Sequence, residues 1–133
     1  MGRTNDDGLM VKTMTTILIV DDYPVTQRVL STQLRKNGYS VVTAGSAREA
    51  LNRLAEAQVD LAILDIAMPE VDGLMLLRQL RGDTRYQGMP IIMLTASGQD
   101  QDRIEAREAG ANDFLSKPAS SRELLDTVEH WLA

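Results

Sequence analysis

Four short apolar segments, each followed directly by residues that can do chemistry, place the strongest constraint on how this chain folds. They cover residues 17–20, 61–64, 91–94 and 114–116, and they are followed by Asp21 and Asp22, by Asp65, by Thr95, and by Lys117 and Pro118. Segments with helical spacing of apolar residues lie between them. Strands that alternate with helices form parallel sheets, in which the carboxyl ends of all strands lie along one edge. We therefore expect three carboxylates, one hydroxyl and one ammonium group to converge at that edge.

The spacing predicts five strands and five helices. The strands are expected over residues 16–20, 40–44, 60–64, 90–94 and 112–115. The helices are expected from Pro24 to a terminating Gly38, from Ser46 onward, over 72–81, over 100–109 and from Ser120 onward. Two of these starts, Ser46 with Glu49 and Ser120 with Glu123, match the capping-box pattern. The result is one α/β domain of the (βα)5 type, with helices on both faces of a parallel sheet.

Two helices differ in the apolar face they offer to the core. The first helix is expected to bury four residues, Val25, Val29, Leu30 and Leu34. The helix over 100–109 has only a thin apolar stripe of Ile104, Ala106 and Ala109. Little apolar burial means weak anchoring. This helix is therefore either an ordinary solvated surface helix or one that shifts when the site is loaded, and the sequence leaves both open.

Composition excludes several classes of function. The length of 133 residues suits one domain, and the net charge of −5 argues against non-specific binding to nucleic acid or to anionic membrane. The absence of cysteine excludes disulfides and thiolate chemistry and fits a reducing, cytoplasmic location. No apolar run is long enough to span a bilayer. Residues 1–14 lack the apolar core of a secretory signal and are expected to be a disordered leader before a domain over 15–133.

The polar residues suit the transfer of a phosphoryl group to a carboxylate. Asp65 can act as a nucleophile and become an acyl phosphate. The anionic nucleophile and the anionic phosphate repel each other, so a metal ion must neutralise charge as it develops. Mg²⁺ commonly takes one or two carboxylates together with phosphate oxygens, and Asp21 and Asp22 can supply them. Lys117 can pair with one phosphate oxygen, and Thr95 can donate a hydrogen bond to another.

The chain resembles the receiver domain of two-component response regulators, from about residue 15 to residue 133. The motifs that carry the resemblance are Ile-Leu-Ile-Val-Asp21-Asp22, Leu-Asp65-Ile-Ala-Met68-Pro69-Glu-Val-Asp72-Gly73, Leu94-Thr95-Ala96 and Phe114-Leu-Ser-Lys117-Pro118. In this order they are highly specific. The resemblance implies a flavodoxin-like three-layer sandwich whose five-stranded parallel sheet has the order 2-1-3-4-5.

The resemblance also implies roles in a phosphorelay. Asp65 would be the phosphoacceptor, taking the phosphoryl group from a phosphohistidine of a sensor histidine kinase or a histidine phosphotransfer protein. Thr95 and Lys117 would bind phosphoryl oxygens and assist catalysis. Mg²⁺ would be held by Asp21, Asp22, Asp65 and the backbone carbonyl of Ala67. The chain would not be an enzyme, apart from catalysing its own phosphorylation and dephosphorylation.

A switch and a signalling surface are implied in the same way. Phe114 would be the switch aromatic, turning inward as Thr95 moves toward the phosphate, and the Lys117–Pro118 peptide would be cis. The helix over 100–109, the strand over 112–115 and the last helix would form the signalling surface for a downstream protein target or a fused output domain. No direct contact with nucleic acid or membrane is expected. A homodimer through this surface is left open.

The residues also bear on three other interpretations of the function. A pseudo-receiver would keep the shape and signal without phosphate, and the complete set of five site residues argues against it. A phosphohydrolase that uses an aspartyl phosphate would carry a second acid two residues after its nucleophile, but Ala67 and Tyr23 occupy those positions. A flavin- or nucleotide-binding protein would need a Gly/Ser/Thr-rich loop after the first strand, where this chain is acidic.

Overall fold

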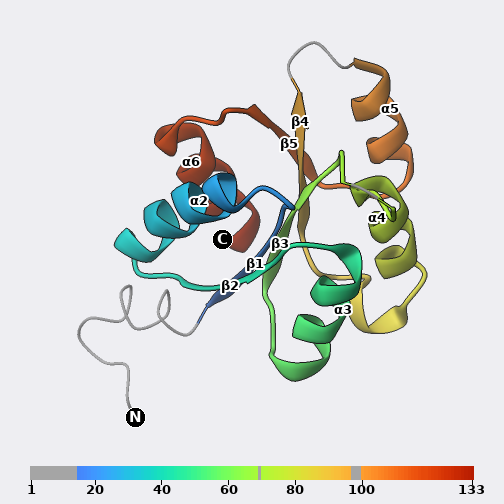
Figure 1. Cartoon of the computed structure of the whole chain (residues 1–133), viewed down its shortest axis with the longest axis horizontal. Coiled ribbons are helices and arrows are strands. Elements are labelled where there is room, and N and C mark those ends of the chain that lie inside the picture. The colour runs from blue at the N-terminus through green and yellow to red at the C-terminus, as the bar shows by residue number, and fades with distance from the viewer. Residues whose placement is uncertain (1–14, 69, 97–99) are drawn as a thin grey trace.

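The computed structural model describes residues 15–68, 70–96 and 100–133, and it folds as a three-layer α/β sandwich (Figure 1). The strands are β1 (Thr16–Val20), β2 (Ser40–Ala44), β3 (Leu61–Asp65), β4 (Ile91–Ala96) and β5 (Asp113–Lys117). They form one parallel sheet of order β2-β1-β3-β4-β5, which confirms the expected fold. The leader expected over residues 1–14 lies outside the described residues.

Five α-helices cover the two faces of the sheet. They are α2 (Pro24–Lys36), α3 (Ala47–Glu56), α4 (Gly73–Arg81), α5 (Asp100–Glu108) and α6 (Ser121–Leu132), with a short 3₁₀ helix, η1 (Thr84–Tyr86), after α4. Helices α2 and α6 lie on one side of the sheet, and α3, α4 and α5 lie on the other (Figure 1). Among the described residues, no helix is long and apolar enough to cross a membrane.

The apolar strands supply two cores through their alternation. Leu18 and Leu64 belong to the core under α3, α4 and α5, whereas Ile19 and Ile63 belong to the core under α2 and α6. All five residues of β3 are buried, as expected for a central strand covered on both faces. Burial on both faces fixes the register, because a slip by one residue would exchange the two cores. The carboxyl ends of β1, β3, β4 and β5 are thereby held at one edge.

The strands that carry site residues run further than the sequence predicts. Strand β4 continues to Ala96 and β5 to Lys117, whereas the apolar patterns end at Leu94 and Leu115. The backbone pairs Thr95 with Ser116 across this extension. A polar residue continues a strand when its neighbour supplies the ladder partner. Thr95 and Lys117 are therefore held inside the sheet, and not in flexible loops.

Two predictions about apolar helix faces are wrong in part. Leu30 and Leu34 are buried, but Val25 and Val29 stay about half exposed, because successive residues lie about 100° apart around a helix and only one stripe meets the sheet. In α5, Ala106 is fully buried and Ile104 is 51% exposed. Residues two apart lie on nearly opposite sides of a helix, so these two cannot both face the core.

The two capping boxes also differ. The box at Ser120 and Glu123 is complete and begins α6 as predicted. At α3, Ser46 accepts from the amide of Glu49, but the Glu49 carboxylate accepts from the amide of Gly45 and not from that of Ser46. The helix is still capped, because each side chain satisfies one backbone donor.

Gly73 sets how closely α4 approaches the strand that ends in Asp65. The amide of Gly73 donates to the carbonyl of Ile66, at 3.1 Å. A Cβ on residue 73 would lie 2.0 Å from the backbone oxygen of Asp65. Only glycine permits this approach. Any side chain at position 73 would therefore prevent the backbone contact that closes the loop between β3 and α4.

An arginine at the end of α4 ties three segments together at the amino ends of β4 and β5. Arg81 donates from Nε to the carbonyl of Gly110 at 2.9 Å, and from Nη1 to the carbonyl of Tyr86 at 2.7 Å. Its Nη2 donates to Asn112 Oδ1 at 2.7 Å, and that oxygen also accepts from the amide of Ile91. We call these five residues the arginine cluster. Its polar groups are partly buried and are paired with one another.

Candidate functional site

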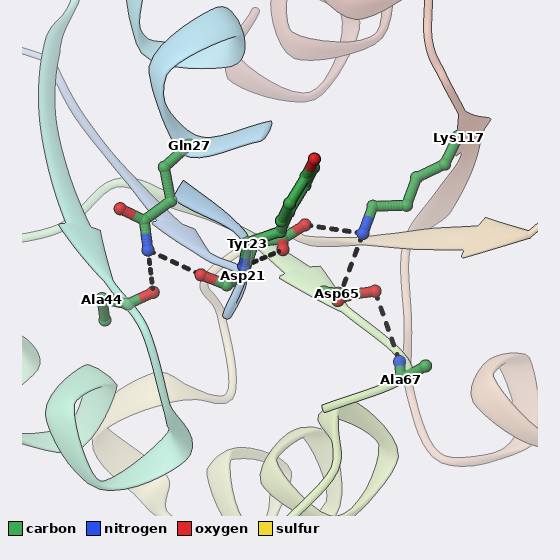
Figure 2. Close-up of polar contacts among 7 residues, drawn as sticks. All are labelled: Asp21, Tyr23, Gln27, Ala44, Asp65, Ala67 and Lys117. Carbon is green, nitrogen blue, oxygen red and sulfur yellow. Dashed lines mark hydrogen bonds and ion pairs between the residues drawn. The ribbon is translucent and has the colours of Figure 1, made fainter. Parts of the chain in front are cut away.

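Asp21, Asp65 and Lys117 meet at the carboxyl edge of the sheet, as the alternation of strands and helices predicts (Figure 2). Asp21 follows β1 and is fully buried, and Asp65 ends β3 and is 3% exposed. Lys117 ends β5 and points its Nζ between them, 2.8 Å from Asp21 Oδ2 and 3.2 Å from Asp65 Oδ2. The Lys117–Pro118 peptide is cis. One ammonium group thus bridges two buried carboxylates.

Backbone amides hold the other oxygens of the two buried acids. The amide of Tyr23 donates to Asp21 Oδ1 at 2.8 Å, and the amide of Ala67 donates to Asp65 Oδ1 at 3.3 Å (Figure 2). Both donors come from the residue two positions after the acid, so each loop turns back on its own carboxylate. The side chains of the buried acids are therefore aimed by the loops that follow them.

Burial and like charge make the site electrostatically costly. Burial raises the pKa of Asp65 above its ordinary value, and the charge of Asp21 raises it further, although Lys117 and the amide of Ala67 act in the opposite direction. Burial lowers the pKa of Lys117, but its hydrogen bonds and the charges of Asp21 and Asp65 outweigh that effect and raise it overall. The site holds more negative charge than its one lysine compensates.

The three aspartates form a ligand set that suits a hard divalent cation. One carboxylate oxygen from each of Asp21, Asp22 and Asp65 lies within 4.8 Å of the others. Asp22 is exposed, whereas the other two are buried. Three carboxylates and one ammonium leave two negative charges uncompensated. An all-oxygen donor set with one open side fits Mg²⁺, which keeps several waters when it binds protein.

Thr95 lies near the carboxyl end of β4, and Phe114 is the second residue of the neighbouring strand β5. Thr95 is fully buried, and its hydroxyl has no hydrogen-bond partner among the described residues. Phe114 is partly buried, with the guanidinium carbons of Arg103 and Arg107 at 5.9 Å and 5.1 Å from the centre of its ring. Arg103 also donates to Ser116 Oγ at 2.8 Å. An unsatisfied buried hydroxyl is uncommon and marks a group available to a ligand.

The comparisons decide the family. The model of the response regulator receiver domain matches residues 17–129. This chain belongs to that family. The receiver domain is 42% identical over 113 residues to the transcriptional regulatory protein GltR of Pseudomonas aeruginosa, a match that covers 85% of this chain and 47% of GltR. Receiver domains are signalling domains.

Solved structures agree with this assignment. The chemotaxis protein CheY4 of Vibrio cholerae superposes with a TM-score of 0.84 at 33% identity, covering 89% of this chain and 98% of that one. The receiver domain of NtrX from Brucella abortus gives a TM-score of 0.82 at 29% identity, covering 87% and 97%. By contrast, the chain spans less than half the length of the curated relatives it matches.

Two groups of contacts around the receiver site escape prediction from the sequence. The side chain of Gln27 reaches from α2 to two backbone carbonyls beside Asp21. Arg103 and Arg107 of α5 stack on Phe114. The charges of α5 are visible in the sequence, but their partner is not, because the pairing depends on how α5 lies against β5. Gln27 gives no signal, since a polar residue in the first turn of a helix is usually solvated.

Proposed function

We propose that this receiver domain accepts a phosphoryl group on Asp65 in a two-component phosphorelay. The observation that carries the proposal is the buried trio of Asp21, Asp65 and Lys117, joined by the exposed Asp22. A carboxylate oxygen of Asp65 would form a bond to phosphorus while the P–N bond to a donor histidine breaks. The departing imidazole keeps the electron pair of that bond and takes up a proton. The product is an acyl phosphate.

The residues of the site divide the work of the transfer. Asp21, Asp22, Asp65 and the carbonyl of Ala67 would hold Mg²⁺, whose positive charge offsets the negative charge of the phosphoryl oxygens. Lys117 already lies between the two buried acids and would move its ammonium onto a phosphoryl oxygen. The burial of Asp65 keeps the reacting carboxylate poorly solvated and so available as a nucleophile.

The donor is proposed to be a sensor histidine kinase or a histidine phosphotransfer protein, reached in the cytoplasm. A groove of about 400 Å³ beside the site is lined by Tyr23 and Val29 from the α2 side and by Lys117 and Pro118 from the β5 side. Tyr23 is 56% exposed and Val29 is 51% exposed, so apolar surface faces solvent there. Apolar surface next to a buried acceptor suits a protein donor that must place its histidine over the edge of the sheet.

Phosphorylation is proposed to change the surface formed by α5, β5 and α6. The buried hydroxyl of Thr95 would turn to a phosphoryl oxygen, and Phe114 would move inward into the space released. Arg103 and Arg107 hold Phe114 from α5, so a moving ring must break those contacts and shift the helix. Helix α5 buries little apolar area, which lowers the resistance to such a shift. A downstream protein or a fused output domain would recognise the altered surface.

The acceptor can be tested with phosphoramidate, a small molecule that carries the same P–N bond as phosphohistidine. With Mg²⁺ present, the intact protein should gain the mass of one phosphoryl group, and Asp65→Asn should gain none. Asp126→Asn is the matched control, since it removes an exposed carboxylate of α6. Phosphoryl labelling that persists in Asp65→Asn would refute the assignment of Asp65 as the acceptor. A wild-type protein that takes up none would favour a pseudo-receiver.

A further inference from the structure

We propose that Gln27 is a positioning residue for the metal site, which rests on the proposed function above. Gln27 lies in the first turn of α2, and its amide nitrogen reaches two backbone carbonyls. Nε2 donates to the carbonyl of Asp21 at 2.6 Å and to that of Ala44, the last residue of β2, at 3.2 Å (Figure 2). Both partners are acceptors, so the group that faces them must be the NH₂ and not the carbonyl oxygen.

The two bonds fix Asp21 to the end of β2. The amide of Asp21 donates to the same Ala44 carbonyl at 3.0 Å, so that oxygen accepts from both residues. The side chain of Gln27 also lies against the turn after β2, where a Cβ on Gly45 would be 3.6 Å from Nε2. With the contacts of its carboxylate to Tyr23 and Lys117, Asp21 is held at its amide, its carbonyl and both carboxylate oxygens.

Asp22 depends on this arrangement because it has few restraints of its own. It is exposed, and no hydrogen bond or ion pair of its carboxylate is found within the described part of the chain. The carbonyl of Asp21 and the Cα of Asp22 lie in one rigid peptide plane. By fixing that carbonyl, Gln27 fixes the orientation of the peptide plane from which the Asp22 side chain extends. The side chain of Gln27 thereby places the third carboxylate of the set, without touching a metal ion.

Loss of the two donors should weaken metal binding more than folding. Gln27→Met keeps the size of the side chain and removes its N–H groups. We expect the dissociation constant for Mg²⁺ to rise about tenfold, since residues that orient metal ligands typically contribute 10–100-fold to affinity. Arg53→Met is the matched control. Arg53 donates from Nε to the carbonyl of Thr43 at 3.1 Å, one residue before Ala44 on the same strand, and it touches no site residue.

The experiment is a titration of each variant with MgCl₂, followed by amide NMR, with melting temperatures measured in EDTA. The proposal predicts similar small losses of melting temperature in both variants and weaker Mg²⁺ binding only in Gln27→Met. Unchanged Mg²⁺ affinity in Gln27→Met, or an equal loss in Arg53→Met, would overturn it. If the wild-type protein binds no Mg²⁺, the proposed function fails separately. The metal-free spectra then decide, because Gln27→Met must still shift the Asp22 and Tyr23 amides.

Discussion

Two polar clusters lie at opposite edges of the same sheet, and they differ in how completely their polar groups are paired. At the amino edge, the guanidinium of Arg81 is paired with backbone carbonyls and with Asn112. At the carboxyl edge, Asp21 and Asp65 repel each other around one lysine, and the hydroxyl of Thr95 is unpaired within the described residues. The difference indicates that a partly buried cluster with paired polar groups stabilises the fold, whereas a buried cluster with uncompensated charge and an unpaired hydroxyl is suited to a ligand.

The largest expected effect lies at the satisfied edge. Replacement of Arg81 by methionine removes its partly buried hydrogen bonds to Gly110, Tyr86 and Asn112, and it should lower the free energy of unfolding by on the order of 3 kcal/mol. Urea denaturation measures this loss. Arg85→Met is the control, because Arg85 is exposed and its guanidinium contacts its sequence neighbours Asp83 and Tyr86 at the surface, so its loss should change stability little. Equal losses in the two variants would contradict the contrast.

Mg²⁺ should stabilise the protein through the carboxyl edge of the sheet and not through the arginine cluster. Mg²⁺ at about ten times its dissociation constant should raise the free energy of unfolding by about 1.4 kcal/mol. The increase should be the same in wild-type protein and in Arg81→Met, because the two clusters are separate. Replacement of both Asp21 and Asp65 by asparagine should abolish it. Thermal melts with and without MgCl₂ test this, and a smaller increase in Arg81→Met would show that the edges are coupled.

Removal of the charge of Asp65 should stabilise the fold. The folded-state pKa of Asp65 is raised, so its contribution to stability is fully present below the unfolded pKa and is lost as the pH rises through the folded pKa. Asp65→Asn should therefore be more stable than wild type at pH 7, by on the order of 1 kcal/mol. The difference should shrink as the pH falls toward about 4. Urea melts at the two pH values measure it, with Asp126→Asn as a control that should show neither effect. A less stable Asp65→Asn at neutral pH would contradict the contrast.

The smallest expected effect is at Thr95. Thr95→Val removes a buried hydroxyl without a partner among the described residues, so stability should change by less than about 0.5 kcal/mol, in either direction. The amide shifts that a phosphate-mimicking fluoride complex of beryllium induces around Phe114 should nevertheless be lost. A destabilisation as large as that of Arg81→Met would mean that the Thr95 hydroxyl is bonded in the native state.

The carboxyl edge is predictable from the sequence, and the amino edge is not. Parallel topology brings the carboxyl ends of β1 and β3 to one edge, so Asp21 and Asp65 can be placed together without coordinates. Arg81 is only the last residue of a predicted helix, and Asn112 only the first of a predicted strand. The contact between Arg81 and Asn112 depends on the angle at which α4 packs and on the turn through Gly110. Neither can be predicted from a sequence pattern.

Failures on the helices have the same origin. The sequence shows which helix residues are apolar, but their periodicity does not show which of two adjacent apolar stripes on the helix faces the sheet. Leu30 and Val29 are both apolar, and only Leu30 is buried. The exposed Val29 belongs to the groove beside the site. Apolar residues that a helix leaves in solvent near a functional edge are thus informative only after the packing is known.

The backbone contact at Gly73 has a consequence for library design. A Cβ at this position would lie 2.0 Å from the backbone oxygen of Asp65, so every other amino acid, alanine included, would displace the backbone where α4 meets the end of β3. A saturation screen of the chain should therefore find Gly73 among the least replaceable positions, although it contributes no reactive atom. A library that varies the residues around this loop should therefore keep Gly73 fixed.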